Sequence, residues 1–193
     1  MKRSVFSRIL ILCEGQTELL YAKALKQVIP RSAQRNFEID IYSFKKTDPK
    51  SLVWEAKKRL KMSKVEKNPY EMIWIFFDND NHPKLKEAFD IIEAEGFKFA
   101  YSSISIEHWF ILHFEDCGRA FRDSKEAIKY LKKHWPEYHK TKINHYALTV
   151  DKYSAAKERA IRSRAKYRTE SGMNTYNPYT NVDELVDFIK SKK

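Results

Sequence analysis

The sequence predicts an α/β fold, in which a mostly parallel, four-stranded sheet is flanked by helices and followed by a helical C-terminal half. Two observations support this. Short apolar runs alternate with amphipathic segments up to about residue 118, the order typical of parallel sheets covered by helices. After residue 105 the apolar residues recur at helical spacing. Because the 193 residues contain no Pro-, Gly- or Ser-rich linker, we treat the chain as one domain, with an α/β core over about 1–118 and a helical extension over about 119–193.

Four segments carry the strand signal. The first, Arg8 to Cys13, and the third, Met72 to Phe77, are continuous apolar runs, which are typical of strands buried on both faces of a parallel sheet. The second strand is expected over Phe37 to Phe44, where apolar and polar residues alternate, and the fourth over Phe97 to Tyr101.

Helices are expected between and after these strands. Thr17 can cap the first helix, and Pro49 and Pro83 suit the first turns of the second and the third. The predicted helices cover residues 18–28, 49–67, about 83–95, 106–114, 124–134, about 153–167 and 182–190.

Composition narrows the class of protein. Hydrophobic residues make up 42% of the chain and glycine only 4 residues, which excludes disordered, collagen-like and low-complexity chains. No apolar run approaches the roughly 18 residues that span a bilayer, and residues 1–7 lead into too short an apolar run for a signal peptide. The settings of Cys13 and Cys117 favour reduced thiols over a disulfide framework. We therefore expect a cytoplasmic protein that does not insert into a membrane.

The charge of the chain points to a polyanionic partner. Lys and Arg number 37 against 26 Asp and Glu, which gives a formal net charge of +11 and a pI near 9.5. Such a basic protein is suited to binding nucleic acid. Residues 68–118 are nevertheless acidic overall. Clustered carboxylates repel phosphates unless divalent cations intervene, so the combination favours metal-assisted phosphate chemistry; a patchwork of ordinary solvated faces is the alternative.

Three acids are the first candidates for a metal site. Glu14 directly follows the first predicted strand, and Asp78 and Asp80 follow the third. In extended backbone, residues two apart lie on the same side, so Asp78 and Asp80 can face one pocket while Asn79 points away. Mg²⁺, or Mn²⁺ in its place, prefers such oxygen ligands, and Glu14 can complete the site or act as an acid/base group. The alternative is a solvent-exposed turn, because Asp and Asn are common in loops.

A fourth acid, Glu107, is expected near the same sheet edge because it follows the fourth predicted strand. It is a candidate catalytic residue that binds a second metal ion, or else a helix N-terminal glutamate favoured by the helix dipole. His82 could shuttle a proton, although a histidine in a surface loop is the simpler interpretation. We expect Trp109, Phe110 and His113 to pack in the core.

Basic side chains are candidates for contacts with substrate phosphates. Arg159, Arg162 and Lys166 recur three and four residues apart, which places them on one helix face. Lys140 can stabilise charge on a transferring phosphoryl group. A solvated face is the alternative for these residues. The further candidates are Lys45, Lys46, Lys57, Lys58, Arg59, Arg164 and Arg168.

Four short motifs, in this order along the chain, resemble the signatures of the RloB-like family. They are Cys13 to Glu18, Phe77 to Asp80, Ser102 to Phe114 and Asn177 to Val182, and together they extend over nearly the whole chain. The third motif departs from the family pattern, because Ser103, Ile104 and Ile106 stand where the family has Asn, Pro and Phe. The absent proline allows an ordinary helix start before Glu107.

The resemblance implies a Toprim-like fold, in which a glutamate after the first strand and an Asp-x-Asp after a later strand bind Mg²⁺; here these are Glu14, Asp78 and Asp80. It also implies nuclease activity, an ABC- or AAA-type ATPase partner, and a role in antiviral defence through restriction or abortive infection. Two rival functions stay open: a non-catalytic, regulatory or toxin-like subunit that docks on the ATPase, and a simple basic nucleic-acid-binding module. The sequence distinguishes neither DNA from RNA nor one oligomeric state from another.

Overall fold

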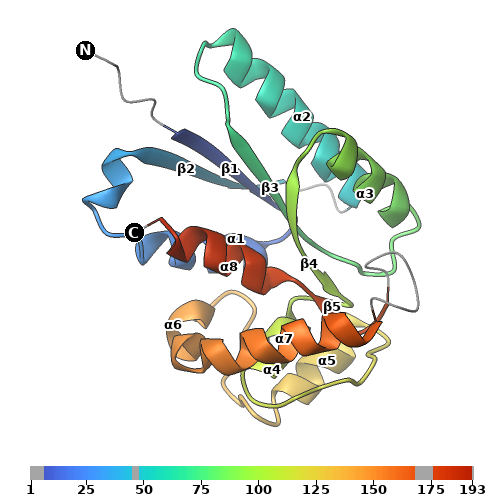
Figure 1. Cartoon of the computed structure of the whole chain (residues 1–193). Coiled ribbons are helices and arrows are strands. Elements are labelled where there is room, and N and C mark those ends of the chain that lie inside the picture. Colours follow the sequence, from blue (N-terminus) through green and yellow to red (C-terminus); the bar gives the residue numbers. More distant parts are fainter. Residues whose placement is uncertain (1–6, 45–47, 168–175, 193) are drawn as a thin grey trace.

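The computed structural model describes residues 7–44, 48–167 and 176–192. Its centre is a sheet with the strand order β2-β1-β3-β4-β5, in which β1 to β4 are parallel and β5 runs antiparallel to β4 (Figure 1). The strands are β1 (Ser7–Cys13), β2 (Phe37–Ser43), β3 (Met72–Asp78), β4 (Lys98–Ser103) and β5 (Tyr179–Thr180). The predicted α/β class and the four parallel strands are confirmed.

The fifth strand, β5, is the part of the sheet that the sequence did not predict. It is two residues long and pairs with the end of β4, so it carries no apolar period of its own. The side chain of Asn181 holds it in place, accepting a hydrogen bond from the backbone N–H of Tyr101 at 2.8 Å and donating one to the carbonyl of Phe99 at 3.1 Å. The helical C-terminal half therefore contributes a strand to the sheet.

The strand order creates a switch point between β1 and β3. Ile11 in β1 pairs with Ile41 of β2 on one side and with Trp74 of β3 on the other. The chain therefore leaves β1 toward one side of the sheet and, after β2, returns past it to form β3. In open α/β sheets ligands bind outside the carboxyl ends of the strands at such a point, and here Glu14 follows β1 and Asp78 ends β3.

The two faces of the sheet pack against different helices. Ile11 and Phe76 lie in the core on the side of α1 (Gln16–Gln27) and α8 (Val182–Lys190), whereas Leu12 lies in the core on the side of α2 (Pro49–Val65) and α3 (Leu85–Ala94). This alternation follows from the two-residue period of a strand. By the same period Asp78, two residues after Phe76, belongs to the face of α1.

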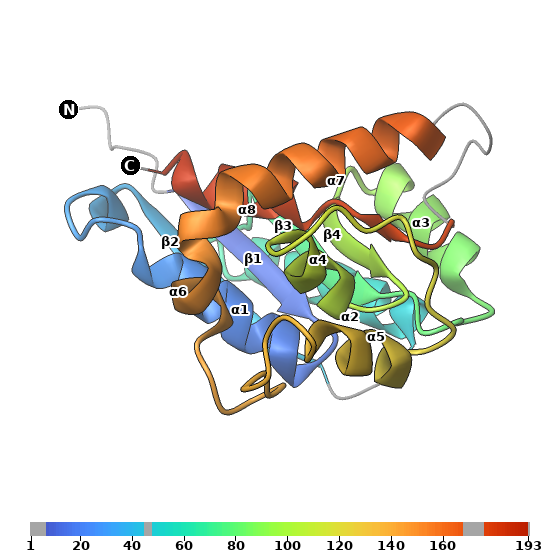
Figure 2. The same ribbon diagram turned by 90° about the horizontal axis from the view of Figure 1, so that it is seen from below.

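The helical half gathers on one side of the sheet, below it in Figure 1 and nearest the viewer in Figure 2. It packs into the same core as α1 and α8. Its helices are α4 (Glu107–Leu112), α5 (Ser124–Leu131), α6 (His145–Thr149) and α7 (Tyr153–Tyr167), and two short 3₁₀ turns cover Ala33–Arg35 and Val150–Lys152.

Helix starts follow local capping in part. Asp48 caps α2 by accepting a hydrogen bond from the backbone N–H of Ser51 at 2.9 Å, and Pro49 occupies the first turn as predicted. The predicted cap at Thr17 is wrong, because α1 begins at Gln16 and Thr17 is buried inside its first turn. The short helix α6 was not predicted; Asn144 caps it through the N–H of Ala147 at 3.1 Å.

Over residues 7–44, 48–167 and 176–192, no helix combines the length and apolarity that a bilayer crossing requires. Cys13 and Cys117 are buried free thiols, as predicted. Burial raises the pKa of both, most strongly that of Cys13, which makes them poor nucleophiles.

Candidate functional site

The loop after β1 turns Glu14 toward the end of β3. The backbone N–H of Glu14 donates to the carbonyl of Phe76 at 2.9 Å, which continues the β1–β3 pairing for one residue. Its carboxylate then accepts a hydrogen bond from the backbone N–H of Asp78 at 3.1 Å. Burial, together with the charges of Glu18 and Asp80, raises the pKa of Glu14 to about 8, although the hydrogen bond from Asp78 lowers it.

The turn after β3 is fastened to the end of β4. The backbone N–H of Asn79 donates to the carbonyl of Ser102 at 2.9 Å, and its side-chain amide donates to the hydroxyl of Ser103 at 3.0 Å. Asp80 has a φ of 40°, in the left-handed region. The expectation of extended backbone through Asp80 is therefore wrong, because regular strand geometry ends at Asp78, and Asp tolerates the left-handed region better than most residues.

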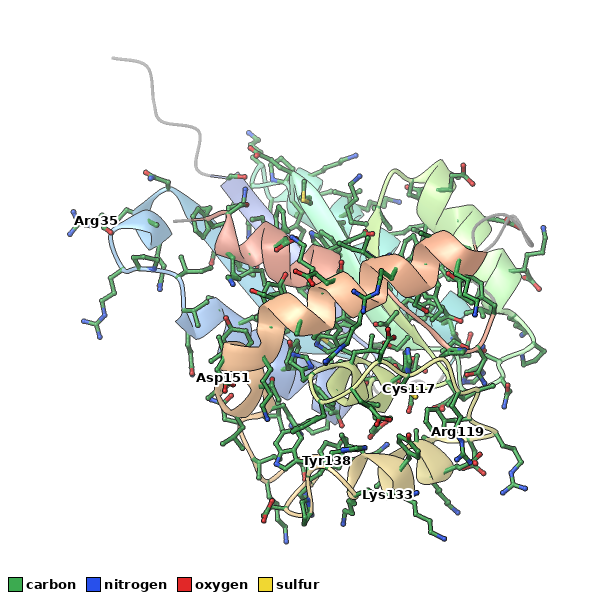
Figure 3. The ribbon with its side chains drawn as sticks, turned by 60° about the horizontal axis from the view of Figure 1, so that its bottom comes forward. Arg35, Cys117, Arg119, Lys133, Tyr138 and Asp151 are labelled. Atoms are coloured by element: carbon green, nitrogen blue, oxygen red, sulfur yellow. The ribbon has the colours of Figure 1, made fainter. Side chains whose placement is uncertain are left out.

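Glu107 reaches the site from the start of α4. Its side chain is 0% exposed, and one carboxylate oxygen accepts a hydrogen bond from the hydroxyl of Tyr138 at 2.7 Å. The ammonium group of Lys140 lies 3.6 Å from the same oxygen. Tyr138 belongs to the segment between α5 and α6, under the sheet (Figure 3). A glutamate serving only the helix dipole could remain in solvent, whereas this one is enclosed.

Glu18, in the first turn of α1, is a site residue that the sequence reasoning missed. It is only 5% exposed. Burial and the charge of Glu107 raise its pKa to about 7, while Lys140 lowers it. No signal in the sequence marks it, because an acid in the first turn of a helix is ordinary.

Gly15 makes room for this arrangement. A Cβ atom at this position would lie 2.5 Å from a carboxylate oxygen of Glu18. Any larger residue at position 15 would therefore push the Glu18 carboxylate away from where it now lies. The short segment between β1 and α1 thus places two acids and the space that one of them needs.

Together Glu14, Glu18, Asp78, Asp80 and Glu107 form what we call the acid cluster. Burial raises the pKa of Asp78 well above its usual range, and the charges of Glu18, Glu107 and Glu14 add to this effect. Partial burial also raises the pKa of Asp80. One oxygen of Asp78 and one of Glu107 are buried without a hydrogen-bond partner. Buried, unpaired carboxylate oxygens are costly unless a proton or a cation neutralises them.

Lys140 is the cation of this region. Its side chain is half-exposed, and the carboxylates of Glu107, Asp78, Glu18 and Asp80 raise its pKa despite the opposing effect of burial. His82 is placed less closely, with its Nε2 atom 3.9 Å from a Glu14 oxygen. That separation exceeds a hydrogen bond.

The acid cluster fits Mg²⁺ or Mn²⁺ in the chemistry of its donors. These cations bind carboxylate oxygens, and one oxygen of Asp78 and one of Glu107 have no hydrogen-bond partner and are available as metal ligands. The positions of the carboxylates, however, do not match a metal site that is ready to bind. Within the described residues, no three or more Asp, Glu, His or Cys side chains converge closely enough to hold a metal ion as they stand. A bound cation would therefore have to draw these side chains together.

The arginines of α7 form hydrogen bonds and ion pairs with other residues of the chain. Arg159 donates to the carbonyl of Leu112 at 2.6 Å, and Arg162 pairs with Asp116 at 3.0 Å on the surface. Arg164 forms two hydrogen bonds with Asp183 and a third with Thr180. Other predicted phosphate contacts are also engaged: Lys57 pairs with Glu95, Arg59 with Glu55, and Lys166 has an interaction of its own, whereas Lys45, Lys46 and Arg168 lie outside the described residues.

The aromatic part of the third motif packs in the interior. Trp109 and Phe110 are fully buried and His113 is nearly so, as predicted. Trp109 donates its indole N–H to the hydroxyl of Tyr21 in α1 at 2.9 Å. This contact fixes α4 against α1, the two helices whose first turns carry Glu107 and Glu18.

Comparison with known protein families identifies one that covers most of the chain. The sequence profile of the RloB-like protein family matches residues 9–189 of the chain. No curated protein sequence matches this chain significantly. The matched range contains every member of the acid cluster, together with Tyr138 and Lys140.

Proposed function

We propose, from the premise that this chain belongs to the RloB-like protein family, that it is a metal-dependent nuclease subunit that hydrolyses phosphodiester bonds of nucleic acid. The observation that supports this best is the acid cluster at the switch point of the sheet, with two buried carboxylate oxygens that lack a partner. Such a cluster is costly to keep without a cation. The family resemblance further supports a role in antiviral defence beside an ABC- or AAA-type ATPase.

In this mechanism the residues divide into ligands and proton-handling groups. Asp78, Asp80 and Glu18 would hold the cation, and Glu107 would be available for a second. A bound Mg²⁺ supplies charge neutralisation for the phosphate and lowers the pKa of water. Glu14, whose pKa of about 8 lies near cellular pH, can take a proton from the attacking water or return one to the leaving oxygen.

Lys140 and Tyr138 complete the proposed machinery. The ammonium of Lys140, a half-exposed side chain beside the acid cluster, can stabilise the negative charge that develops on the phosphoryl group. Tyr138 fixes the orientation of the Glu107 carboxylate through its hydroxyl. It acts as a positioning residue, since its hydroxyl is occupied by that hydrogen bond.

Calorimetric titration of Mg²⁺ and Mn²⁺ into the full chain tests this function without knowledge of the substrate. We expect saturable binding by the wild type, its loss in an Asp78→Asn/Asp80→Asn variant, and its retention in Asp90→Asn, an exposed acid of α3. Equal binding by all three would contradict the metal site. Cleavage of single-stranded DNA, duplex DNA and RNA is then assayed with and without the ATPase.

A second function is favoured by two observations. The acids do not converge into a finished metal site among the residues described, and Lys140 already offsets part of their charge. Both features suit a non-catalytic subunit that docks on the ATPase. Unaltered ATPase binding by the Asp78→Asn/Asp80→Asn variant, with loss of cleavage, would exclude this alternative.

A further inference from the structure

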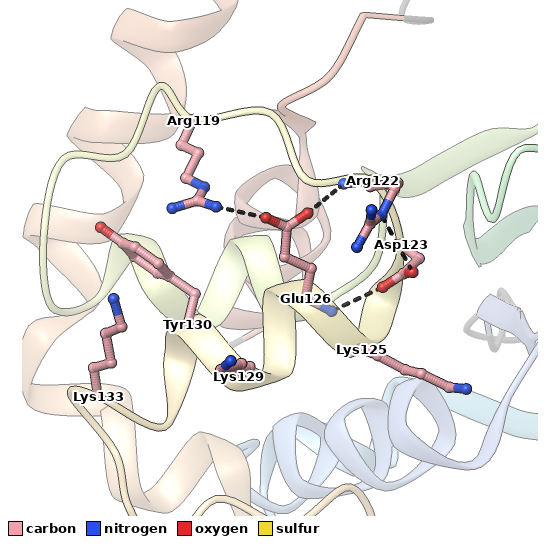
Figure 4. A pocket seen from close by; sticks show the side chains of 8 residues that line it. All are labelled: Arg119, Arg122, Asp123, Lys125, Glu126, Lys129, Tyr130 and Lys133. Atoms are coloured by element: carbon pink, nitrogen blue, oxygen red, sulfur yellow. Dashed lines mark hydrogen bonds and ion pairs between the residues drawn. The ribbon is translucent and has the colours of Figure 1, made fainter.

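A basic pocket lies on α5, in the segment that leads to Tyr138 and Lys140. Its volume is about 510 Å³, and Tyr130 forms part of its wall (Figure 4). Five cationic side chains line it, against two carboxylates, Asp123 and Glu126. We call these five the α5 basic surface: Arg119, Arg122, Lys125, Lys129 and Lys133.

Among the described residues, some of these cations have interaction partners and two have none. Arg119 pairs with Glu126, and the Lys133 ammonium lies 4.9 Å from the centre of the Tyr130 ring. Lys125 and Lys129 are exposed, and no described residue forms a hydrogen bond or an ion pair with either. Being four residues apart on α5, they share a face, and their positions are separated by about 6 Å along the helix.

The α5 basic surface is tied at both ends to the acid cluster. Before α5, the carbonyl of Arg122 accepts a hydrogen bond from the side-chain amide of Asn81, the residue after Asp80, at 3.4 Å. After α5, Tyr138 donates to Glu107. Figure 3 shows Arg119 and Lys133 at the two ends of this segment, with Tyr138 beyond. The segment that carries these cations is therefore attached next to the acid cluster both before and after α5.

We propose that the α5 basic surface binds the phosphodiester backbone of a nucleic acid and holds it beside the acid cluster. This inference rests on the proposed function and names the surface that substrate would use. An acidic cluster by itself repels a polyanion, so a substrate needs compensating cations nearby. Exposed lysines spaced along one helix face suit successive phosphates of an extended chain rather than one small anion.

The character of the surface also predicts how it binds. Arg119 and Lys133 lie over the Tyr130 ring, at 5.4 and 4.9 Å from its centre, so that ring is covered and does not offer a free platform for a base. Lysine contacts to phosphates carry no sequence information. We therefore expect binding that depends strongly on salt and weakly on base sequence.

Fluorescence anisotropy with labelled oligonucleotides in EDTA tests the proposal on the full chain. The probes are a 20-nucleotide single-stranded DNA, the matching duplex, and a single-stranded RNA. In a Lys125→Gln/Lys129→Gln variant we expect at least a tenfold loss of affinity for the probes that bind. The slope of log affinity against log salt should fall by about 2, roughly one per phosphate contact removed.

The matched control is Lys61→Gln/Lys64→Gln, which removes two exposed lysines from α2 on the other face of the sheet. It should bind like the wild type. Equal affinity of the α5 variant and the wild type, an equal loss in the α2 variant, or no binding of any probe by the wild type would each overturn the proposal. Thermal melting of each variant tests whether the fold is retained.

This experiment fails separately from the test of the proposed function. Binding in EDTA requires no metal ion, and calorimetric metal titration requires no nucleic acid. Loss of probe binding in the α5 variant with normal Mn²⁺ binding would support both. Normal Mn²⁺ binding without any effect of the α5 substitutions would leave the metal site standing and remove only the surface.

Discussion

The carboxylate of Glu14 accepts a hydrogen bond from the backbone N–H of Asp78 at 3.1 Å. This contact joins the residue after β1 to the last residue of β3 across the switch point of the sheet. It keeps Glu14 turned inward, where burial raises its pKa to about 8. A group anchored on one oxygen can still exchange a proton on the other, which is what an acid/base role requires.

The metal-free protein is expected to lose stability as pH rises. The pKa of Glu18 is about 7, above the usual value for glutamate, so the folded chain binds this proton more tightly than the unfolded chain does. Protonated Glu18 stabilises the folded chain fully below about pH 4.5, the ordinary pKa of glutamate. This stabilisation is lost as the pH rises to about 7, the pKa of Glu18 in the folded chain. Glu18→Gln should remove the contribution of Glu18 to this pH dependence, which is on the order of 3 kcal/mol in the free energy of unfolding. Between pH 5 and 8 the melting temperature of the variant should therefore fall several degrees less than that of the wild type.

The comparison for that prediction is Glu93→Gln, an exposed acid on α3. Its melting temperature should follow the wild type across the same pH range. Parallel pH curves for the Glu18→Gln variant and the wild type would show that Glu18 is ionised at no cost in the folded chain.

Gly15→Ala should weaken Mn²⁺ binding through Glu18. The added Cβ would meet a Glu18 oxygen at 2.5 Å, so the carboxylate must move. We expect a severalfold loss of Mn²⁺ affinity in calorimetric titration. The melting temperature should fall by only a few degrees, because Gly15 is the N-cap of α1 and alanine is a poorer cap, at a cost of about 1 kcal/mol. Gly118→Ala is the control, because its Cβ would meet nothing within 4 Å. In a Glu18→Gln background the Gly15→Ala effect should vanish.

The sequence could place Glu14 and Asp78 at one sheet edge because buried strands are visible as apolar runs, and carboxylates follow directly where two of them stop. It could not identify Glu18. An acid in the first turn of a helix is ordinary, because the helix dipole favours it. What makes this one unusual is enclosure by α4 and by the segment that carries Lys140, contacts that only the fold creates.

The sequence pattern predicts phosphate contacts on α7 rather than on α5. Helical spacing groups Arg159 and Arg162 on a face but does not show what that face packs against. Arg159 is held by the carbonyl of Leu112 and Arg162 by Asp116. Lys125 and Lys129 of α5 have no such partner among the described residues, and the contact between Asn81 and Arg122 joins their segment to the turn that carries Asp80.

Arg164→Met should destabilise the fold without any substrate present. Arg164 forms two hydrogen bonds, of 2.6 and 2.7 Å, with Asp183, whose side chain is buried. Removing the guanidinium leaves that carboxylate unpaired, which costs about 3–5 kcal/mol and should lower the melting temperature on the order of 10 °C. The exposed pair of Arg162 and Asp116 provides the control: Arg162→Met should cost less than about 1 kcal/mol. Comparable losses in both would contradict a buried structural role for Arg164.

Lys140→Gln should separate metal binding from catalysis. The Lys140 ammonium faces Glu107 at 3.6 Å, and Asp78 and Asp80 also interact with it. Removing this positive charge takes away a competitor for the carboxylates, so Mn²⁺ should bind severalfold more tightly in calorimetric titration. If Lys140 stabilises charge on the phosphoryl group, kcat for phosphodiester cleavage should nevertheless fall about 100-fold or more. Lys142→Gln, two residues along the same segment, is the control and should change neither quantity. Tighter Mn²⁺ binding with unchanged cleavage would assign Lys140 to balancing the charge of the acid cluster alone.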